Sequence, residues 1–433
     1  MRYSIVTFGC RVNHADSLRI EEDLRARGGV EAASRDADLV IVNTCSVTAT
    51  ADQGARQTIR RIARENPNAK IVATGCYATR CEDEVAALPV WKVVPNAAKL
   101  QIGHTGDGPC GAPIEPGIAG RTAFTIRAQT GCEERCAYCI IPATRGASRS
   151  ASVASLVAEV ERVAAAGFKE VTVTGVHLGS YGRDLDPAAS LLDLLRALAD
   201  ARGDVMFRIS SLEPMDCSPA IVDFVAASGR FLPHFHLPLQ HASDRLLAAM
   251  RRPYTLDDYR ALVDGIVEKL PHASIGSDMI VGFPGETEAD FRANLEYLPS
   301  SPLTHLHVFP YSDRPGTVAS SMRDKVHGSI VRDRATQLRD IGVGLSRRFR
   351  ASQAGAIRPG LTLEDGTLVV TDNYLKLRIA PGHARNERVF VRLSIEGADL
   401  QAEVVADPRV ATSWKRASTS RDAGPAISGE WTR

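Results

Sequence analysis

The stretch that decides the fold is "TAFTIRA" (122–128), followed after one residue by "TGCEERCAYCIIP" (130–142). The first segment has the β-branched, apolar character of a buried strand. The second places Cys132, Cys136 and Cys139 within eight residues and offers no fourth cysteine. A closed zinc site takes four ligands. Three cysteines after a strand therefore indicate either a remote fourth ligand, such as His177 or His236, or a metal centre with an open position.

Further strand–helix units follow this stretch. Six units in succession predict a partial (β/α)6 barrel, whose active site would lie at the carboxyl ends of its strands. Pro238 and Pro310 cannot donate a hydrogen bond in a parallel ladder, so we place both near such ends. The other five candidate strands are 170–176, 205–211, 234–240, 273–283 and 304–312.

The first 96 residues show the same alternation. Strand candidates at 3–9, 38–44 and 69–75 are separated by helical segments, and 91–95 is a fourth strand candidate. This alternation predicts a parallel sheet with helices on both faces, an α/β sandwich. Cys10, Cys45 and Cys76 each follow one of these strands, and the carboxyl edge of such a sheet is where ligands bind. A single cysteine there would be read as a small buried hydrophobe. Three in the same topological position favour a metal or iron–sulfur site.

The remaining segments complete the predicted domain order. Residues 97–120 are rich in Gly and Pro and form a linker between the N-terminal domain (1–96) and the barrel. We assign 121–352 to the barrel with a trailing basic helix from about 322, and 353–406 to a small all-β module. Residues 407–433 have the composition of a disordered tail. Cys81, Cys110 and Cys217 match no pattern and are interpreted as structural or incidental.

The amino-acid composition limits the classes of protein to which the chain can belong. The 433 residues exceed one ordinary core, and 44% hydrophobic with 24% charged residues is typical of a soluble globular protein. No apolar run approaches the roughly 20 residues of a membrane span, and the N-terminus lacks a secretory signal. We therefore expect a cytoplasmic protein without a membrane partner, in which clustered cysteines are ligands rather than disulfides. A net charge of +1 requires any RNA-binding surface to be local.

Cys-x3-Cys-x2-Cys with an aromatic residue before the last cysteine, Tyr138, resembles the signature of the radical S-adenosylmethionine (SAM) superfamily. From Met1 to about residue 406, the order of cysteines, linker, barrel and β module resembles the methylthiotransferase family. Five further stretches are similar to motifs of that family: "GVHLGSYGRDL" (175–185), "RISSLEP" (208–214), "FHLPLQHASDRLLAAMRR" (235–252), "SDMIVGFPGET" (277–287) and "HVFPYSDRPGT" (307–317).

This resemblance implies an enzyme with two [4Fe–4S] clusters and SAM. The barrel cysteines would bind three irons of one cluster, and SAM would occupy the fourth, which explains the missing ligand. A one-electron donor such as flavodoxin or ferredoxin would reduce that cluster, and SAM cleavage would yield a 5′-deoxyadenosyl radical. Cys10, Cys45 and Cys76 would hold an auxiliary cluster that presents sulfur from an unidentified sulfur source. The cofactors carry out the difficult chemistry, while side chains ligate and orient.

The candidate SAM contacts follow strand ends or lie near the cysteine motif. For each of them the alternative is a satisfied polar or core residue of the barrel. They are Tyr138, Gly175, His177, Gly179, Ser211, Glu213, Gln240, Asp278, Ile280, Gly282 and Phe309.

The substrate expectation rests on the tripeptide after the first cysteine, Arg11-Val12-Asn13. Within the family this tripeptide resembles the type that methylthiolates C2 of N6-threonylcarbamoyladenosine at position 37 of tRNA, beside the anticodon. Methylthiolation of isopentenyladenosine in tRNA, or of a ribosomal-protein aspartate, is the alternative, and Arg314 argues against the latter. A non-catalytic iron–sulfur or zinc protein that binds RNA is the alternative of another class.

Three basic or polar segments are candidates for tRNA contacts. The helical segment 55–66 and the basic helix could both meet phosphates, although an ordinary solvated helix face explains either equally well. The β module resembles a TRAM RNA-binding domain, yet it carries about as many acids as bases. The candidates are Arg56, Arg60, Arg61, Arg64, Arg347, Arg348, Asn373, Tyr374 and Lys376.

Overall fold

The computed structural model describes residues 1–102, 115–117, 121–397 and 399–408. The chain divides into two compact units, Met1–Phe349 and Arg350–Arg433, each of which we describe by itself. The finer boundaries at residues 96, 120 and 406 stay predictions. Most of the predicted linker with Cys110, and nearly all of the predicted tail, lie outside the described residues.

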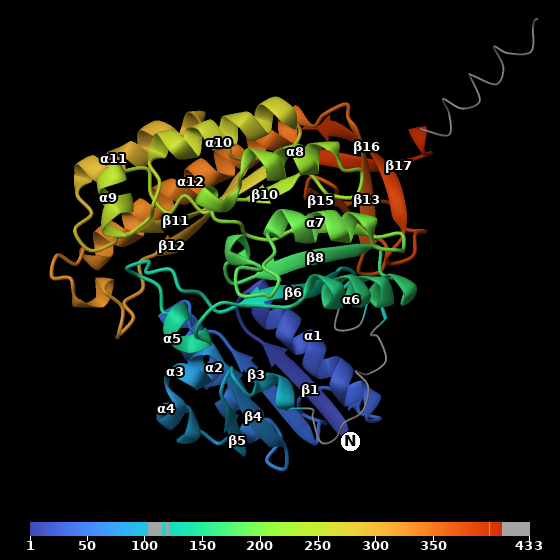
Figure 1. Cartoon of the computed structure of the whole chain (residues 1–433), viewed down its shortest axis with the longest axis vertical. Helices are drawn as coiled ribbons and strands as arrows, with labels where there is room; N and C mark the ends of the chain where they lie inside the picture. The colour runs from blue at the N-terminus through green and yellow to red at the C-terminus, as the bar shows by residue number, and fades with distance from the viewer. Residues whose placement is uncertain (103–114, 118–120, 398, 409–433) are drawn as a thin grey trace, which may run out of the picture. The chain divides into compact units, whose positions relative to one another are not determined.

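The first unit begins with a five-stranded, wholly parallel sheet in the order β2-β1-β3-β4-β5 (Figure 1). Four of its five strands are the predicted ones; the two-residue β2 was not foreseen, because so short a strand leaves no periodicity. The strands are β1 (Arg2–Thr7), β2 (Val30–Glu31), β3 (Leu39–Thr44), β4 (Lys70–Gly75) and β5 (Lys92–Val94).

Alternation along these strands explains the helices on both faces. Ile41 of β3 packs with Ile20 and Leu24 of the first helix, whereas its neighbours Val40 and Val42 pack on the opposite face. The helices are α1 (Arg11–Ala26), α2 (Ala49–Glu65), α3 (Cys76–Arg80), α4 (Glu82–Ala86) and the 3-10 turn η1 (Lys99–Gln101). The predicted α/β sandwich is confirmed.

The six barrel strands run parallel in two sheets, β6-β8-β9 and β10-β11-β12, which a parallel bridge between Ser211 and His236 joins. The short β7 (Arg149–Ser150) pairs antiparallel with β6. The six are β6 (Phe124–Thr130), β8 (Glu170–Gly175), β9 (Met206–Ile209), β10 (His234–His236), β11 (Ser274–Val281) and β12 (His305–Pro310). Strand β10 ends two residues before Pro238, and Pro310 is the last residue of the edge strand β12, as its missing donor requires.

Helices cover the outer face of these strands, and Figure 1 shows α6 and α7 beside β8. Their apolar stripes pack on alternate strand residues such as Val171, Val173 and Ile275. The basic helix begins at Gly328 rather than at about 322. The helices are α5 (Ile141–Arg145), α6 (Val153–Ala165), α7 (Leu191–Asp200), α8 (Pro219–Ala227), α9 (Asp244–Ala249), α10 (Leu256–Lys269), α11 (Glu288–Tyr297) and α12 (Gly328–Ser352).

The second unit is an antiparallel half-barrel in the order β15-β14-β13-β16-β17, as predicted for a small all-β module. Its strands are β13 (Ile357–Leu363), β14 (Leu368–Thr371), β15 (Lys376–Arg378), β16 (Arg388–Glu396) and β17 (Asp399–Val405). Across the part of the chain that the structure describes, no helix is both long enough and apolar enough to cross a bilayer.

Candidate active site

The structure brings the three N-terminal cysteines to one edge of the sheet. Cys10 follows β1, Cys45 follows β3 and Cys76 begins α3 after β4, and these three strands are neighbours. Cys45 and Cys76 are buried and Cys10 is exposed. Burial, together with the nearby thiols of Cys10 and Cys76, raises the pKa of Cys45 to about 11. The predicted convergence exists, and the role of these sulfurs as cluster ligands stays a prediction.

Two glycines allow the cysteine loops to approach one another. Gly9 precedes Cys10 and has a φ of 88°, and Gly75 precedes Cys76 and has a φ of 99°. Residues that carry a side chain rarely adopt such positive φ angles. A Cβ on Gly9 would overlap Cys45, and one on Gly75 would overlap the carbonyl oxygen of Thr44. Both positions therefore require the absence of a side chain.

Gly75→Ala is expected to remove the auxiliary cluster while the barrel cluster remains. The new methyl group must push the Cys76 loop away from Thr44, which separates the three sulfurs. After anaerobic reconstitution, iron should fall from about eight to about four atoms per chain, measured by elemental analysis. Gly229→Ala is the control, since no atom lies within 4 Å of a Cβ there. Full iron in Gly75→Ala would contradict this account.

The side chain of Asn13 forms hydrogen bonds to two of the cysteine loops. Its Nδ2 donates to the carbonyl oxygens of Phe8 (2.9 Å) and Thr44 (2.8 Å), which precede the Cys10 and Cys45 turns. Its Oδ1 accepts from Lys99 (3.2 Å) and from Arg145 (2.6 Å). The sequence marked Asn13 only as part of a tripeptide, whereas the structure gives this buried amide a positioning role.

A buried ion network joins the sheet domain to the barrel. Asp16 on α1 accepts from Lys99 (3.0 Å), Arg145 (3.1 Å) and Arg127. Burial alone would raise the pKa of the Asp16 carboxyl, but these three cations lower it. Burial would likewise raise the pKa of Cys76, and Arg145 with Lys99 lowers it below its ordinary value. Arg145, which closes α5 after the barrel motif, thus stabilises a thiolate of the other cysteine set.

A second ion network connects the same domains. Asp52 on α2 accepts from Arg80 (2.7 Å) and from Arg314 (2.8 Å), and all three side chains are largely or fully buried. Arg314 belongs to the stretch "HVFPYSDRPGT" after β12. This residue, which the sequence used only to choose within the family, fixes the loop after β12 to the domain that carries Cys45.

The barrel motif follows β6 directly. Nη1 of Arg252 donates to Sγ of Cys136 (3.2 Å), and Nη2 pairs with Glu213. His177 lies between Asp216 (Nε2–Oδ2 2.7 Å) and Cys132; although burial opposes its charge, these hydrogen bonds raise the pKa of the imidazole to about 10. N–H donors on cysteine sulfur are the usual surroundings of an iron–sulfur cluster. The sequence missed Arg252, which follows the cysteines by more than a hundred positions.

The spacing of the sulfurs argues against a single zinc ion. Thiolates on tetrahedral zinc lie about 3.8 Å apart, because each Zn–S bond is about 2.3 Å. In the described residues, the ligand set whose atoms all lie within 4.8 Å of one another is His236, Asp278 and His307, and neither cysteine set is that compact. As they lie in this structure, the sulfurs of neither set are close enough together for all three to bind one zinc ion.

Packing accounts for the absence of a side chain at three of the candidate SAM contacts, which are glycines. A Cβ on Gly175 would press on Leu178, and one on Gly179 would overlap Asp216. Gly282 has a φ of 77° and lies against Val331 of α12. These contacts explain the three glycines without a cofactor.

The other candidates divide into packed and accessible residues. Ile280 packs in a small core that includes Ala137 of the cysteine loop, and Tyr138 lies against that core. Ser211 and Phe309 are exposed, and Gln240 is buried with a φ of 70°, a strained backbone of the kind that clusters at functional sites. Glu213 pairs with Arg252, and Asp278 pairs with two histidines. None of these observations tests SAM binding, so these contacts stay predictions.

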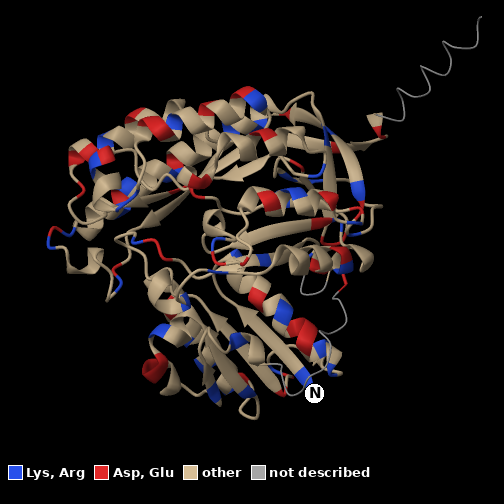
Figure 2. Cartoon of the chain, viewed as in Figure 1, with Lys and Arg blue, Asp and Glu red and all other residues tan. Residues whose placement is uncertain are grey.

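The candidate RNA contacts on helices differ in availability. Arg60, Arg61 and Arg64 on α2 and Arg347 on α12 are exposed. Arg56 pairs with Glu84 (3.0 Å), and Arg348 donates to the carbonyl oxygens of Pro299 (2.7 Å) and Ser301. Figure 2 shows Lys and Arg interspersed with Asp and Glu along the helices in that view, in keeping with the small net charge.

Asn373 is not placed where RNA could reach it. Its side chain is fully buried, donates to Gln353 (2.8 Å) and accepts from Thr371 (2.7 Å), so it shapes the turn instead. Tyr374 has a φ of 69° and is 42% exposed, and Lys376 is exposed beside Glu364. Of the three candidate RNA contacts in this turn, Tyr374 and Lys376 are thus the ones whose side chains are accessible.

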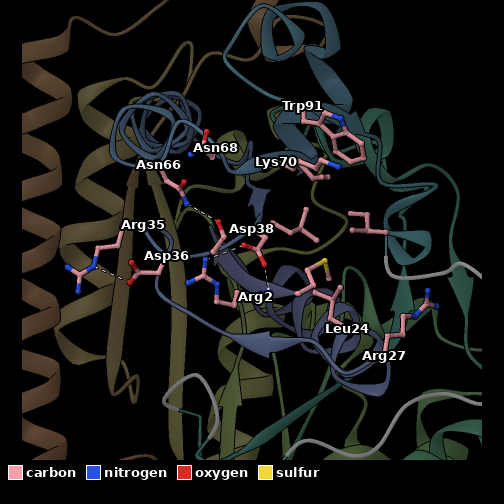
Figure 3. A pocket seen from close by; sticks show the side chains of 15 residues that line it. Arg2, Leu24, Arg27, Arg35, Asp36, Asp38, Asn66, Asn68, Lys70 and Trp91 are labelled. Carbon is pink, nitrogen blue, oxygen red and sulfur yellow. Dashed lines mark hydrogen bonds and ion pairs between the residues drawn. The ribbon is translucent and has the colours of Figure 1, made fainter.

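The remaining described cysteines belong to neither set. Cys217 is buried in the barrel core, in line with a structural role, and Cys81 is half-buried between α3 and α4. A cavity of about 750 Å³ is lined by Arg2, Lys70 and Trp91 among others, whose side chains Figure 3 draws. It lies at the amino ends of β1, β3 and β4, the sheet edge opposite the cysteines, and we assign it no part in the chemistry.

Comparisons with known proteins show the family to which the chain belongs. The model described as Uncharacterized protein family UPF0004 matches residues 2–94, and that of the Radical SAM superfamily matches residues 126–298. A protein of Aquifex aeolicus (strain VF5) named Threonylcarbamoyladenosine tRNA methylthiotransferase MtaB is 34% identical, over 87% of this chain and 96% of its own. The chain belongs to the radical SAM tRNA methylthiotransferase family.

Other relatives of this methylthiotransferase carry two different names. A Bacillus subtilis (strain 168) protein with the same name as the Aquifex relative is 32% identical, over 86% of this chain and 88% of its own. The tRNA-2-methylthio-N(6)-dimethylallyladenosine synthase of Pelotomaculum thermopropionicum is 34% identical, over 78% of this chain and 81% of its own. Percentage sequence identity alone therefore does not decide which of the two nucleosides is the substrate.

A solved structure shares the fold. It is the radical SAM methyltransferase TsrM from Kitasatospora setae, with a TM-score of 0.52 and 18% identity, over 74% of this chain and 76% of that one. The methylthiotransferase is a radical SAM enzyme, and its cofactors are SAM and two [4Fe–4S] clusters. Which residues hold these groups stays a prediction.

Proposed function

We propose that this methylthiotransferase transfers a methylthio group to C2 of N6-threonylcarbamoyladenosine at position 37 of tRNA. The observation that carries the choice is the position of Arg11, the first residue of the tripeptide that pointed to this substrate. Its Nη1 lies 3.5 Å from Oγ1 of Thr172 on β8, inside the barrel. The residue that points to the substrate type thus extends from the sheet domain to the barrel strand β8, which supports a role in the barrel rather than in the sheet domain alone.

The two cysteine sets divide the work. Cys132, Cys136 and Cys139 would hold the cluster that binds SAM, and Cys10, Cys45 and Cys76 the cluster that carries sulfur. Bound there, these groups supply SAM cleavage, hydrogen abstraction and sulfur transfer. The chain's own residues orient two of the sulfurs: Arg252 donates a hydrogen bond to Cys136, and Arg145 lowers the pKa of Cys76.

The similarity to named relatives also ranks the alternative substrates. Isopentenyl-type adenosine in tRNA is the second candidate, because a relative named for a dimethylallyladenosine product is also 34% identical, although over 78% of this chain rather than 87%. A ribosomal-protein aspartate ranks third. The identity of the electron donor and of the sulfur source stays a prediction, with flavodoxin or ferredoxin as the candidate reductant.

Anticodon stem-loops carrying either nucleoside test the proposal. With reconstituted full-length enzyme, SAM and a reductant, the threonylcarbamoyl substrate should be methylthiolated with kcat/KM at least about 10-fold above that for the dimethylallyl substrate, a difference of about 1.4 kcal/mol. Mass spectrometry of the nucleosides gives the product. Exclusive modification of the dimethylallyl substrate would overturn the choice, and modification of neither would direct attention to ribosomal protein.

A further inference from the structure

The inner face of the strands β10, β11 and β12 is polar, whereas the interior of a (β/α) barrel is usually filled by branched apolar side chains. Side chains along a strand point alternately to its two faces. Phe235 of β10, Met279 of β11 and Val308 of β12 pack in the core with the outer helices. The residues beside them therefore face inward, and they include His236, Asp278 and His307.

These three side chains bring one atom each to a common point. Nε2 of His236 lies 2.9 Å from Oδ1 of Asp278, and Nδ1 of His307 lies 3.2 Å from the same oxygen. Among the described residues, this is the group of three possible ligand atoms that all lie within 4.8 Å of one another. Both imidazoles approach one oxygen, so the three atoms surround a point, as the ligands of one metal ion do.

The two distances match those between neighbouring ligands of a metal ion. With bonds of about 2.0–2.1 Å, two ligands lie about 2.9 Å apart at a right angle and about 3.4 Å apart at the tetrahedral angle. The distances from Oδ1 of Asp278 to the two imidazole nitrogens fall in this range. Binding of an ion would release the imidazole protons that the two hydrogen bonds use, because histidine ligates a metal through an unprotonated nitrogen.

The site is supported on one side and accessible on the other. The exposed fraction is 10% for the side chain of His236, 24% for that of Asp278 and 57% for that of His307. The amide of Leu212 donates to the carbonyl oxygen of His236 (2.9 Å), which fixes the end of β10. A Cβ on Gly276 would lie 2.8 Å from Nδ1 of His236, so this glycine leaves room for the ring. An ion would enter past His307.

We propose that His236, Asp278 and His307 bind one divalent transition-metal ion, of the class of Zn²⁺, Fe²⁺ and Mn²⁺, in addition to the two iron–sulfur clusters. Two histidines and one carboxylate are a frequent ligand set for zinc and for non-haem iron(II), whereas clusters are held by thiolates. Water, or an oxygen atom of a bound molecule, would fill the remaining coordination positions. The site uses none of the six cysteines predicted to hold the clusters, and it does not depend on which nucleoside is the substrate.

Binding of Mn²⁺ to the full-length, reconstituted enzyme tests the site. Mn²⁺ is the probe because it prefers oxygen ligands to thiolates, and electron paramagnetic resonance measures the free ion directly. After a chelating resin has removed loosely bound metal, the unaltered enzyme should bind one Mn²⁺ per chain in the absence of SAM. One equivalent of Zn²⁺ should displace it, since zinc binds such ligands more tightly.

Variants of the ligands locate the bound ion. His307→Gln and Asp278→Asn should each weaken Mn²⁺ binding by at least about 10-fold, which corresponds to about 1.4 kcal/mol. His307 is largely exposed, so its replacement leaves the core intact. His327→Gln, which alters an exposed histidine elsewhere, is the matched control and should bind Mn²⁺ as the unaltered enzyme does.

Iron analysis of the same samples gives a second readout. About eight iron atoms per chain should remain in His307→Gln, which shows that the fold and both clusters are retained while the Mn²⁺ site is lost. Absence of Mn²⁺ and Zn²⁺ binding by the unaltered enzyme would overturn the proposal and leave a hydrogen-bonded unit without an ion. Equal Mn²⁺ affinity in His307→Gln and the unaltered enzyme would also overturn it. Methylthiolation enters none of these measurements, so failure of the proposed function would leave their result standing.

Discussion

Cys136→Ala is expected to abolish SAM cleavage. A three-cysteine site that loses one ligand cannot hold its cluster firmly, and the iron that binds SAM is lost with it. The formation of 5′-deoxyadenosine by the reduced, reconstituted variant should fall by about 10³-fold or more, to background, as measured by chromatography. Methylthiolation should disappear together with it, because no radical forms.

Cys45→Ala separates the two sites. This variant should lose methylthio transfer as completely as Cys136→Ala but keep a measurable fraction of SAM cleavage, since the barrel cluster is intact. Cys81→Ala, at a half-buried cysteine outside both sets, is the matched control and should keep both activities. Equal loss of SAM cleavage and methylthio transfer in Cys45→Ala would contradict the division of labour between the clusters.

Asp16→Ala is expected to produce the largest loss of stability. The carboxylate is wholly buried and forms ion pairs with Lys99, Arg127 and Arg145, of which Lys99 and Arg145 are themselves buried. Removing one partner of a buried ion network leaves uncompensated charge and costs about 3–5 kcal/mol in the free energy of unfolding. Denaturation under anaerobic conditions, followed by circular dichroism, measures the change.

A surface carboxylate provides the comparison for Asp16. Asp204 is 69% exposed and lies 3.7 Å from Lys169, so Asp204→Ala should change the free energy of unfolding by less than about 1 kcal/mol. Because folding lowers the pKa of Asp16, its contribution is complete above the pKa of an unfolded aspartate, about 3.9, and is lost as the pH falls below that value. A loss below about 1 kcal/mol for Asp16→Ala would show that the network carries little stability.

The sequence predicted those features that depend on local pattern. Alternating strands and helices gave the parallel sheet and the barrel, because apolar periodicity is legible within one element. The placement of Cys10, Cys45 and Cys76 at one edge followed as well, since the carboxyl ends of neighbouring parallel strands meet. Local spacing was sufficient for Cys132, Cys136 and Cys139.

Contacts between distant segments could not be predicted in this way. Arg145 meets Asn13 and Asp16 across 132 and 129 positions, and Arg252 meets Cys136 across 116. Nothing in the sequence separates these arginines from those of a solvated helix face. The same limit explains Asn373, whose turn sequence suggested RNA contact although its amide is enclosed by Thr371 and Gln353.

The sequence by itself determined the order of the elements and the two cysteine sets, because strand periodicity and ligand spacing are properties of short segments. Only the tertiary structure decided which charges pair, which glycines are required by packing, and that His236, Asp278 and His307 form one unit on the inner face of the barrel. The physical reason is that burial and pairing depend on where the strands β10, β11 and β12 lie relative to one another, and the register that aligns Asp278 with His307 exists only after the barrel has formed.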